Sequence, residues 1–266
     1  MRPFKSFLLT VSFIAVTSIA SAAEASSLRT IHSQPSVVLA TKQVELAVTK
    51  LGGHMAPVTF FRDSARPVQP YHISPWQDEK ASKMPAPVLV PLRGDFFCVP
   101  FGGNSDAVAG EKHPPHGEIV GDPWRVVGTK KSGDVTTLTM GIDTQVRKGH
   151  VTKELSLVAG QNVAYSRNII EGFAGRAPLG HHATLAMPEK EGAVRIATSA
   201  IRFGMTYPGL FSDPKQREYQ SLQPGAKWAD LAKVPAAWKG APDADLTRLP
   251  GRYGYADLIQ LANEPW

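Results

Sequence analysis

Four of the eight histidines in this 266-residue chain stand in two short clusters, where residue type and spacing suggest chemistry most directly. The first cluster is His113-Pro114-Pro115-His116-Gly117-Glu118, and the second is Leu179-Gly180-His181-His182-Ala183-Thr184. An imidazole can donate or accept a proton near neutral pH. Two histidine-bearing loops that converge on one cleft would suit general acid–base catalysis, although ordinary surface or core histidines would give the same pattern.

The same side chains also allow a metal-site interpretation. His113, His116 and Glu118, joined by His181 or His182, offer enough imidazole and carboxylate groups for zinc or manganese, as in cupin-like barrels. The two prolines of the first cluster do not give the every-other-residue spacing that places two ligands on one strand face. We therefore predict no metal and no cofactor, and a metal-dependent cupin-like enzyme stays open as an alternative.

The elements that must position these histidines have the pattern of β-strands. Apolar residues alternate at Val44, Leu46 and Val48, and Gly/Asx turn clusters separate further stretches rich in β-branched and aromatic residues. We predict an all-β fold of antiparallel strands, a sandwich or a barrel, with few helices and at most a short one around Trp228–Lys233. The further stretches are Met55–Phe61, Trp124–Thr129, Thr136–Ile142, Val151–Val158 and Asn162–Ile170.

Length and composition predict a single domain from residue 23 to 266. Residues 62–91 are rich in proline and predict a long surface excursion, and residues 206–252 predict a loop-rich insertion. Tyr255–Leu261 reads as a strand next to the terminus, where an exposed strand edge is a liability. We therefore expect either a sequence truncated before its last strands or an edge covered by a partner or a rearranged terminus.

The first 22 residues have the pattern of a secretory signal peptide. Arg2 and Lys5 precede the apolar run 7–19, and the small residues Ala20-Ser21-Ala22 follow it. The run is shorter than the roughly 20 residues that a spanning helix needs. We predict cleavage before Ala23, export to the periplasm or the extracellular space, and no membrane attachment after cleavage.

Charge and cysteine content narrow the function classes further. The formal net charge is +6, and the Lys and Arg residues are scattered, whereas nucleic-acid binding needs a clustered basic face. The single cysteine, Cys98, excludes an internal disulfide. Its apolar surroundings in the sequence predict a buried, inert thiol.

Several short motifs resemble, in their order along the chain, those of the aldose 1-epimerase superfamily and particularly its hexose-6-phosphate epimerase branch. The run 92–102 is similar to the family's Arg-Gly…Pro-x-x-Gly segment, although it is one residue shorter. His116-Gly117 followed by Trp124 is similar to its His-Gly…Trp segment, and 182–188 to the segment that starts with its catalytic histidine. Leu51-Gly52-Gly53 looks like its early Gly-Gly turn. Together the matches cover about residues 44–190.

The resemblance implies a galactose-mutarotase-type β-supersandwich that interconverts sugar anomers. A base removes the proton of the anomeric hydroxyl while an acid protonates the ring oxygen, and the ring opens and recloses. By the family pattern, His182 is the acid, and His116 and Arg93 hydrogen-bond the sugar or the developing charge. Trp76 is a candidate for stacking on a pyranose ring. The expected partner is a small-molecule carbohydrate.

One departure from the family pattern leaves catalysis open. The family's general base is a glutamate on a late strand, and no residue here matches it, although Glu118 and Asp122 flank the His116 segment. Adjacent strand residues point to opposite faces, so only one of His181 and His182 can face a given cleft. A catalytically silent sugar-binding protein on the same fold is therefore the alternative. The sequence leaves the sugar and the oligomeric state open.

Overall fold

The computed structural model describes residues 27–79, 84–210, 212–251, 257 and 259–262. These residues form two compact units, one of residues 27–69 and 74–182 and the other of residues 70–73 and 183 onward. The sequence predicted one domain with a loop-rich insertion at 206–252, and that insertion lies inside the second unit. The predicted signal peptide and the last four residues lie outside the described part of the chain.

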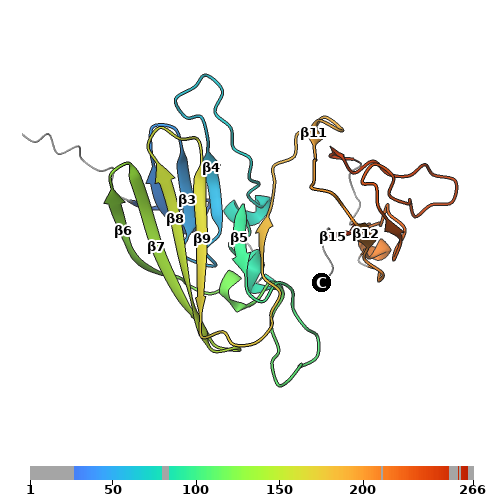
Figure 1. Cartoon of the computed structure of the whole chain (residues 1–266), viewed down its shortest axis with the longest axis horizontal. Coiled ribbons are helices and arrows are strands. Elements are labelled where there is room, and N and C mark those ends of the chain that lie inside the picture. The colour runs from blue at the N-terminus through green and yellow to red at the C-terminus, as the bar shows by residue number, and fades with distance from the viewer. Residues whose placement is uncertain (1–26, 80–83, 211, 252–256, 258, 263–266) are drawn as a thin grey trace, which may run out of the picture. The chain divides into compact units, whose positions relative to one another are not determined.

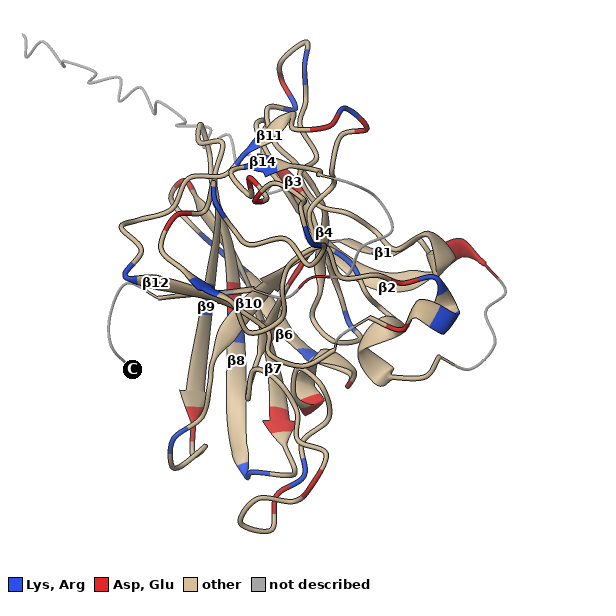
Figure 2. Ribbon diagram, turned by 90° about the vertical axis from the view of Figure 1, so that its right-hand side faces the viewer, with Lys and Arg blue, Asp and Glu red and all other residues tan. Residues whose placement is uncertain are grey.

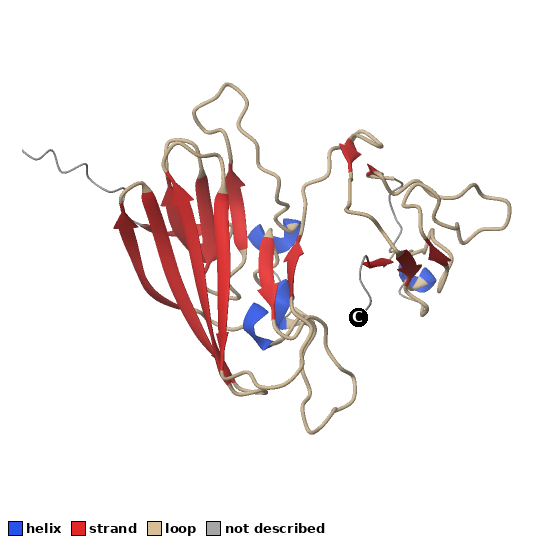
Figure 3. Ribbon diagram, in the orientation of Figure 1, coloured by secondary structure: helices blue, strands red, loops and turns tan. Residues whose placement is uncertain are grey.

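Short strands account for nearly all the regular structure, with four 3-10 helices (η) between them (Figure 3). The strands are β1 (Ser27–Ile31), β2 (Gln34–Ala40), β3 (Glu45–Thr49), β4 (Met55–Thr59), β5 (Asp95–Cys98), β6 (Arg125–Ser132), β7 (Val135–Thr144), β8 (Gly149–Val158), β9 (Ala164–Glu171), β10 (Gly180–Ala183), β11 (Val194–Arg195), β12 (Phe203–Thr206), β13 (Lys227–Trp228), β14 (Arg248–Leu249) and β15 (Ile259–Ala262). The 3-10 helices are η1 (Pro75–Asp78), η2 (Pro87–Leu89), η3 (Glu118–Val120) and η4 (Pro214–Gln216).

The first unit is a β-sandwich, as the sequence predicted. One sheet has six strands in the order β1-β2-β3-β4-β5-β10, and the other has four in the order β6-β7-β8-β9. Figure 1 shows the two sheets layered face to face. The registered pairs β1–β2, β2–β3 and β3–β4, and all pairs of the four-stranded sheet, are antiparallel.

Alternation of side chains explains the core of this sandwich. On β8, Val151, Lys153, Leu155 and Leu157 are buried while the residues that alternate with them are partly exposed, because successive strand residues point to opposite faces. On the six-stranded sheet, Leu46 and Val58 are fully buried. Apolar side chains from both sheets thus meet in one layer, and that burial is the main stabilising term.

Six of the seven strand stretches predicted from the sequence each correspond to one observed strand, from β3 and β4 to β6–β9. The seventh, Tyr255–Leu261, overlaps β15 from Ile259 on, and most of its other residues lie outside the described part of the chain. In the first unit, the sequence analysis missed β1, β2, β5 and β10. The short helix predicted around Trp228–Lys233 was wrong, since β13 ends at Trp228 and turns and bends follow it. Trp228 packs into an apolar cluster, and this tertiary contact outweighs local helix propensity.

The second unit has shorter strands and a smaller core. β12 pairs antiparallel with β13 and β15, and β11 with β14. Its buried cluster consists of Leu222, Trp228, Leu231 and Val234. The Asp257 carboxylate accepts the backbone N–H groups of Ser221 and Leu222 and thereby ties the segment before β15 to this core.

Lys and Arg residues and Asp and Glu residues are dispersed along the chain, as the coloured ribbon shows (Figure 2). Within the described residues, no helix is long and apolar enough to cross a membrane. Cys98 is fully buried, and burial raises the pKa of its thiol to about 12, which confirms that it is buried and inert.

Candidate functional site

His116 and His182, from the two sequence clusters, lie side by side in the first unit. Their ring centroids are 4.9 Å apart and the rings are nearly perpendicular, at 80°. His116 precedes η3, whereas His182 belongs to β10 at the edge of the six-stranded sheet. Both side chains are half-buried. The fold therefore brings together two imidazoles that are far apart in the sequence.

Strand β5 positions His182. Phe96 stacks on His54 at 4.1 Å and on His182 at 4.7 Å, and it meets His116 edge-on at 6.0 Å. Phe101 completes the surroundings at 5.8 Å from the His116 ring and 6.4 Å from the His182 ring. The two imidazoles therefore sit among aromatic rings, which hold their planes and reduce their contact with water.

Backbone strain positions His116. Its φ is 67°, in the left-handed region, and the next residue, Gly117, has a φ of 84°. A Cβ on Gly117 would come within 2.4 Å of the Val99 carbonyl oxygen, so only glycine fits there. A non-glycine residue in this region costs on the order of 1–3 kcal/mol, and such strain clusters at functional sites.

The two imidazoles are held neutral but differ in proton affinity. Burial, and then the charge of His182, lower the pKa of His116 below its ordinary value. Burial also lowers the pKa of His182, but its own backbone and then the Asp95 carboxylate work in the opposite direction. Asp95 thus favours a proton on His182, and a charge on His182 disfavours one on His116. Two imidazoles this close resist a second proton, so they titrate as a unit.

The Nδ1 atoms of His116 and His182 are buried and have no hydrogen-bond partner among the described residues. Buried polar atoms are normally paired with protein, water or a ligand. The fold therefore leaves two buried ring nitrogens unpaired at this pair, a departure that is found at sites with a catalytic role or a bound water.

His54 lies beneath Phe96 and cannot share this proton chemistry. It is fully buried, and burial lowers its pKa to about 3. Its Nε2–H donates to the Val120 carbonyl at 2.9 Å, and its Nδ1 accepts the Arg93 N–H at 3.4 Å. Both ring nitrogens are thus occupied, and His54 is a neutral structural support.

His181 points to the other face, as alternation on a strand requires. Its Nδ1–H donates to Asp95 Oδ2 at 2.9 Å, and its ring lies 5.4 Å from Phe97. Asp95 also raises the pKa of the fully buried Lys153, which burial lowers overall to about 8. His181 therefore belongs to a separate polar cluster with Asp95. Of the two adjacent histidines, it is His182 that contacts His116.

Arg93 does not face the histidine pair. Its side chain is fully buried, with Nη1 donating to the Ile31 carbonyl at 2.9 Å and Nη2 to the His32 carbonyl at 2.8 Å. Nη2 also donates to Gln77 Oε1 at 2.6 Å. These partners tie β1 and η1 to the sheet, which is a structural role; the predicted sugar contact has no support in this geometry.

Trp76 and Glu118, the other predicted contacts, also have structural partners. The Trp76 indole N–H donates to the Leu89 carbonyl at 2.9 Å. Glu118 accepts the backbone N–H groups of Gln145 and Val146 at 2.7 and 3.0 Å. Glu118 thus anchors the β7–β8 turn. The hydrogen bonds of Trp76 and Glu118 go to these backbone groups and not to His116 or His182.

The ligand set of the metal interpretation is not assembled. His113 Nε2 lies 3.1 Å from Glu111, Glu118 holds the β7–β8 turn, and His116 packs on His182. Within the described ranges, no three His, Cys, Asp or Glu side chains converge in a way that could hold a metal ion.

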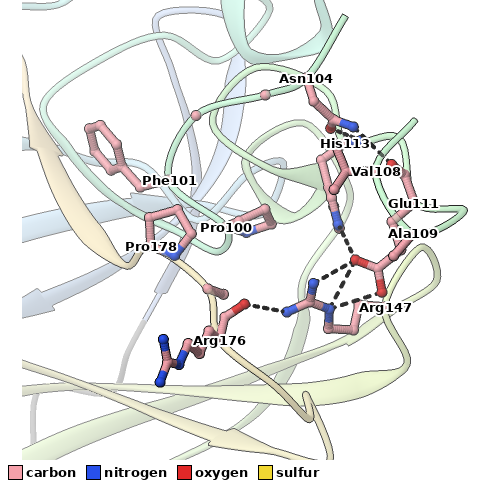
Figure 4. Close-up of a pocket in the computed structure, with 13 residues that line it drawn as sticks. Pro100, Phe101, Asn104, Val108, Ala109, Glu111, His113, Arg147, Arg176 and Pro178 are labelled. Carbon is pink, nitrogen blue, oxygen red and sulfur yellow. Dashed lines mark hydrogen bonds and ion pairs between the residues drawn. The ribbon is translucent and has the colours of Figure 1, made fainter. Parts of the chain in front are cut away.

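A pocket of about 250 Å³ adjoins the histidine pair across Phe101 (Figure 4). Pro100, Phe101 and Pro178 supply apolar surface, and Glu111 and Arg147 supply charges. Arg147 forms ion-paired hydrogen bonds with both Glu111 oxygens, at 3.0 Å from Nε to each and 2.6 Å from Nη2 to Oε2. This pocket shares Phe101 with the surroundings of the two imidazoles.

Sequence reasoning missed Phe96, Phe101, Asp95 and His54 as parts of the site. A signal was present, since Asp95, Phe96 and Phe97 follow one another in a strand and must alternate between faces. Assigning β5 would have placed Phe96 with one of the adjacent histidines and Asp95 with the other. It would not have shown that Arg93 turns inward.

Comparison with known proteins gives only distant structural similarity. No family model matches the chain, and no curated protein matches it. Among solved structures, the Slr1438 protein from Synechocystis sp. PCC 6803 is similar over 84% of this chain and 67% of its own, at 15% identity and a TM-score of 0.47. YeaD from Salmonella typhimurium, described as a proposed mutarotase, is similar over 53% of this chain and 45% of its own, at 15% identity and a TM-score of 0.38. Similarity at this level does not bear on the chemistry of the site.

Proposed function

We propose that this chain binds an aldose at the His116–His182 pair and interconverts its anomers by acid–base catalysis. The observation that carries the proposal is the meeting of these two half-buried imidazoles, 4.9 Å apart, with unpartnered Nδ1 atoms. The ordered sequence motifs that resemble aldose 1-epimerases support the same reaction.

The different proton affinities assign a role to each imidazole. His182 takes the first proton, because Asp95 favours its charged form, and it would donate that proton to the ring oxygen. His116 stays neutral beside a protonated His182 and would accept the proton of the anomeric hydroxyl. The ring opens to the free aldehyde, and the reverse transfers close it on either face. In this mechanism His116 takes the part that the missing glutamate plays in the family pattern.

A catalytically silent sugar-binding protein is the second candidate. One observation favours it: no carboxylate of the described residues forms a hydrogen bond or an ion pair with His116 or His182. Asp95 forms its hydrogen bond with His181 instead. Losing one half of an acid–base pair typically costs a factor of about 100 or more in rate. Binding without turnover would follow if His116 is too weak a base.

The proposed setting is outside the cytoplasm. The charged, apolar and small-residue pattern of residues 1–22 supports export with cleavage before Ala23. In that setting an unphosphorylated sugar is the more accessible substrate. The N-terminal sequence of the protein recovered from its native host tests this, and an intact Met1 would contradict it.

Polarimetry on freshly dissolved glucose and galactose tests the activity. The wild type should accelerate the approach to the equilibrium rotation, and His182→Gln should lower kcat/KM by about 100-fold or more, because the glutamine amide cannot supply the proton. His72→Gln is the matched control, since His72 is an exposed histidine outside the site.

The outcomes separate the two candidates. Loss of rate in His182→Gln with unchanged sugar affinity supports the isomerase. Sugar binding by the wild type without any acceleration supports the silent binding protein. Acceleration that survives in His182→Gln contradicts the role of this residue.

A further inference from the structure

The pocket beside the histidine pair has a preformed shape. Asn104 closes the surrounding loop, because its Nδ2 donates to the carbonyls of Asp106 and Glu111 at 2.6 and 2.8 Å and its Oδ1 accepts the His113 N–H at 2.7 Å. On the opposite side, the Phe101 N–H donates to the Pro178 carbonyl at 2.7 Å. Both walls are therefore fixed by hydrogen bonds, and a ligand entering the pocket would not have to order them.

Glu111 and Arg147 form an ion pair on one wall of the pocket. Arg147, and then His113, lower the pKa of Glu111 to about 2, so this carboxylate stays ionised and pairs with the guanidinium. Arg147 Nη1 also donates to the Arg176 carbonyl at 3.0 Å (Figure 4). Arg176 lines the pocket as well, so its lining carries both the neutralised pair and a further positive charge.

Unused hydrogen-bonding capacity remains on the polar wall. Of the five N–H groups of a guanidinium, Arg147 uses Nε, one on Nη1 and one on Nη2. A molecule with several hydroxyl groups can accept hydrogen bonds from the two remaining N–H groups of Arg147.

The other wall suits the apolar face of a sugar ring. Pro100, Phe101 and Pro178 present carbon surface, against which the C–H face of a pyranose can pack. The volume of about 250 Å³ is below the usual range for drug-sized ligands, roughly 300–1,000 Å³, and suits a single ring.

Phe101 links this pocket to the proposed catalytic pair. Its ring is 38% exposed, lines the pocket, and lies 5.8 Å from the His116 ring and 6.4 Å from the His182 ring. A ligand in the pocket and an aldose at the imidazoles would therefore lie on two sides of one aromatic ring.

We propose that the pocket is a second sugar subsite, which holds the glycosyl unit next to the reducing end of an oligosaccharide. This inference rests on the proposed function for the reducing-end ring at His116 and His182, and it names the substrate class as an oligosaccharide with a free reducing end. The wall of Glu111 and Arg147 binds hydroxyl groups, and Phe101 packs against the ring.

Filling the pocket tests the inference. Val108 lines the pocket with a side chain that is 67% exposed, so Val108→Trp should occupy it without disturbing the core. The matched control is Val127→Trp, at a 62% exposed valine on β6 that does not line the pocket. Wild type and both variants are compared by polarimetry and by titration calorimetry, with lactose and cellobiose against galactose and glucose.

The inference predicts that Val108→Trp lowers disaccharide affinity and kcat/KM by about tenfold or more, with monosaccharide values within about twofold of the wild type and Val127→Trp unchanged. Equal effects on mono- and disaccharides, no effect in Val108→Trp, or no disaccharide binding by the wild type would overturn it. Disaccharide binding that Val108→Trp abolishes, without any turnover, would support the subsite and contradict the proposed catalysis. Monosaccharide turnover with no disaccharide preference would contradict the subsite and support the proposed catalysis.

Discussion

At the scale of single residues, the site depends on which imidazole holds the proton. The sequence indicated that His116 and His182 are candidates, and the fold places them in contact. The fold also explains why the two imidazoles differ in proton affinity, because Asp95 favours a proton on His182 and a charge on His182 disfavours one on His116. The proposed active form therefore carries a single proton, on His182.

A pH profile follows from these shifts. Activity requires protonated His182, so it falls as pH rises through the pKa of His182, and it requires neutral His116, so it also falls as pH drops through the pKa of His116. Both pKa values lie below the ordinary 6.5 of an imidazole. The kcat/KM for an aldose, measured by polarimetry from pH 4 to 8, should therefore be bell-shaped with its maximum on the acid side of 6.5. A maximum above pH 7 would contradict this assignment.

Arg93 is a second test at this scale, because the two interpretations of it predict opposite results. Arg93→Met should lower the free energy of unfolding by about 3 kcal/mol, since buried carbonyl acceptors at Ile31 and His32 lose a charged donor. Urea denaturation measures this loss. A sugar-binding arginine would instead give unchanged stability and lost sugar affinity, and that result would contradict the structural role.

At the scale of elements, the turn before η3 and the strands β5 and β10 determine where His116, Phe96 and His182 lie. Long, regularly alternating strands such as β7 and β8 could be predicted from the sequence, because their period is visible over many residues. β5 and β10 have four residues each and too few positions to show a period. The direction of Arg93 depends on acceptors in β1 and η1, which no local pattern reveals.

A substitution at Gly117 tests whether the turn before η3 holds His116 in place. Gly117→Ala adds a Cβ within 2.4 Å of the Val99 carbonyl oxygen at a φ of 84°, which should displace His116 and lower both stability and kcat/KM. Gly133→Ala is the matched control, since its φ is also positive, at 57°, but no atom lies within 4 Å of the added Cβ. The control should lose only the backbone term, about 1–2 kcal/mol. Equal losses of stability and activity in the two variants would show that the close approach to Val99 does not hold His116.

At the scale of the whole molecule, strand spacing was enough to predict an antiparallel sandwich or barrel, and the resemblance of the motifs favoured the sandwich. They did not predict the division into two units, because residues 70–73 join residues 183–186 through long-range backbone pairs such as His72 N–H to the Thr184 carbonyl. Such pairing leaves no signal in local periodicity. Every residue of the proposed site and of the adjoining pocket belongs to the first unit.

The central claim is that His116 and His182 act as one proton-transfer unit that contacts a sugar. NMR titration of the imidazole ring signals in the whole protein, with and without a saturating aldose, tests it most directly. The predicted result is that His182 titrates before His116 as the pH falls, both below the ordinary value, and that the sugar shifts both sets of signals. Two independent titrations near the ordinary value, with neither set of signals changed by the sugar, would contradict it.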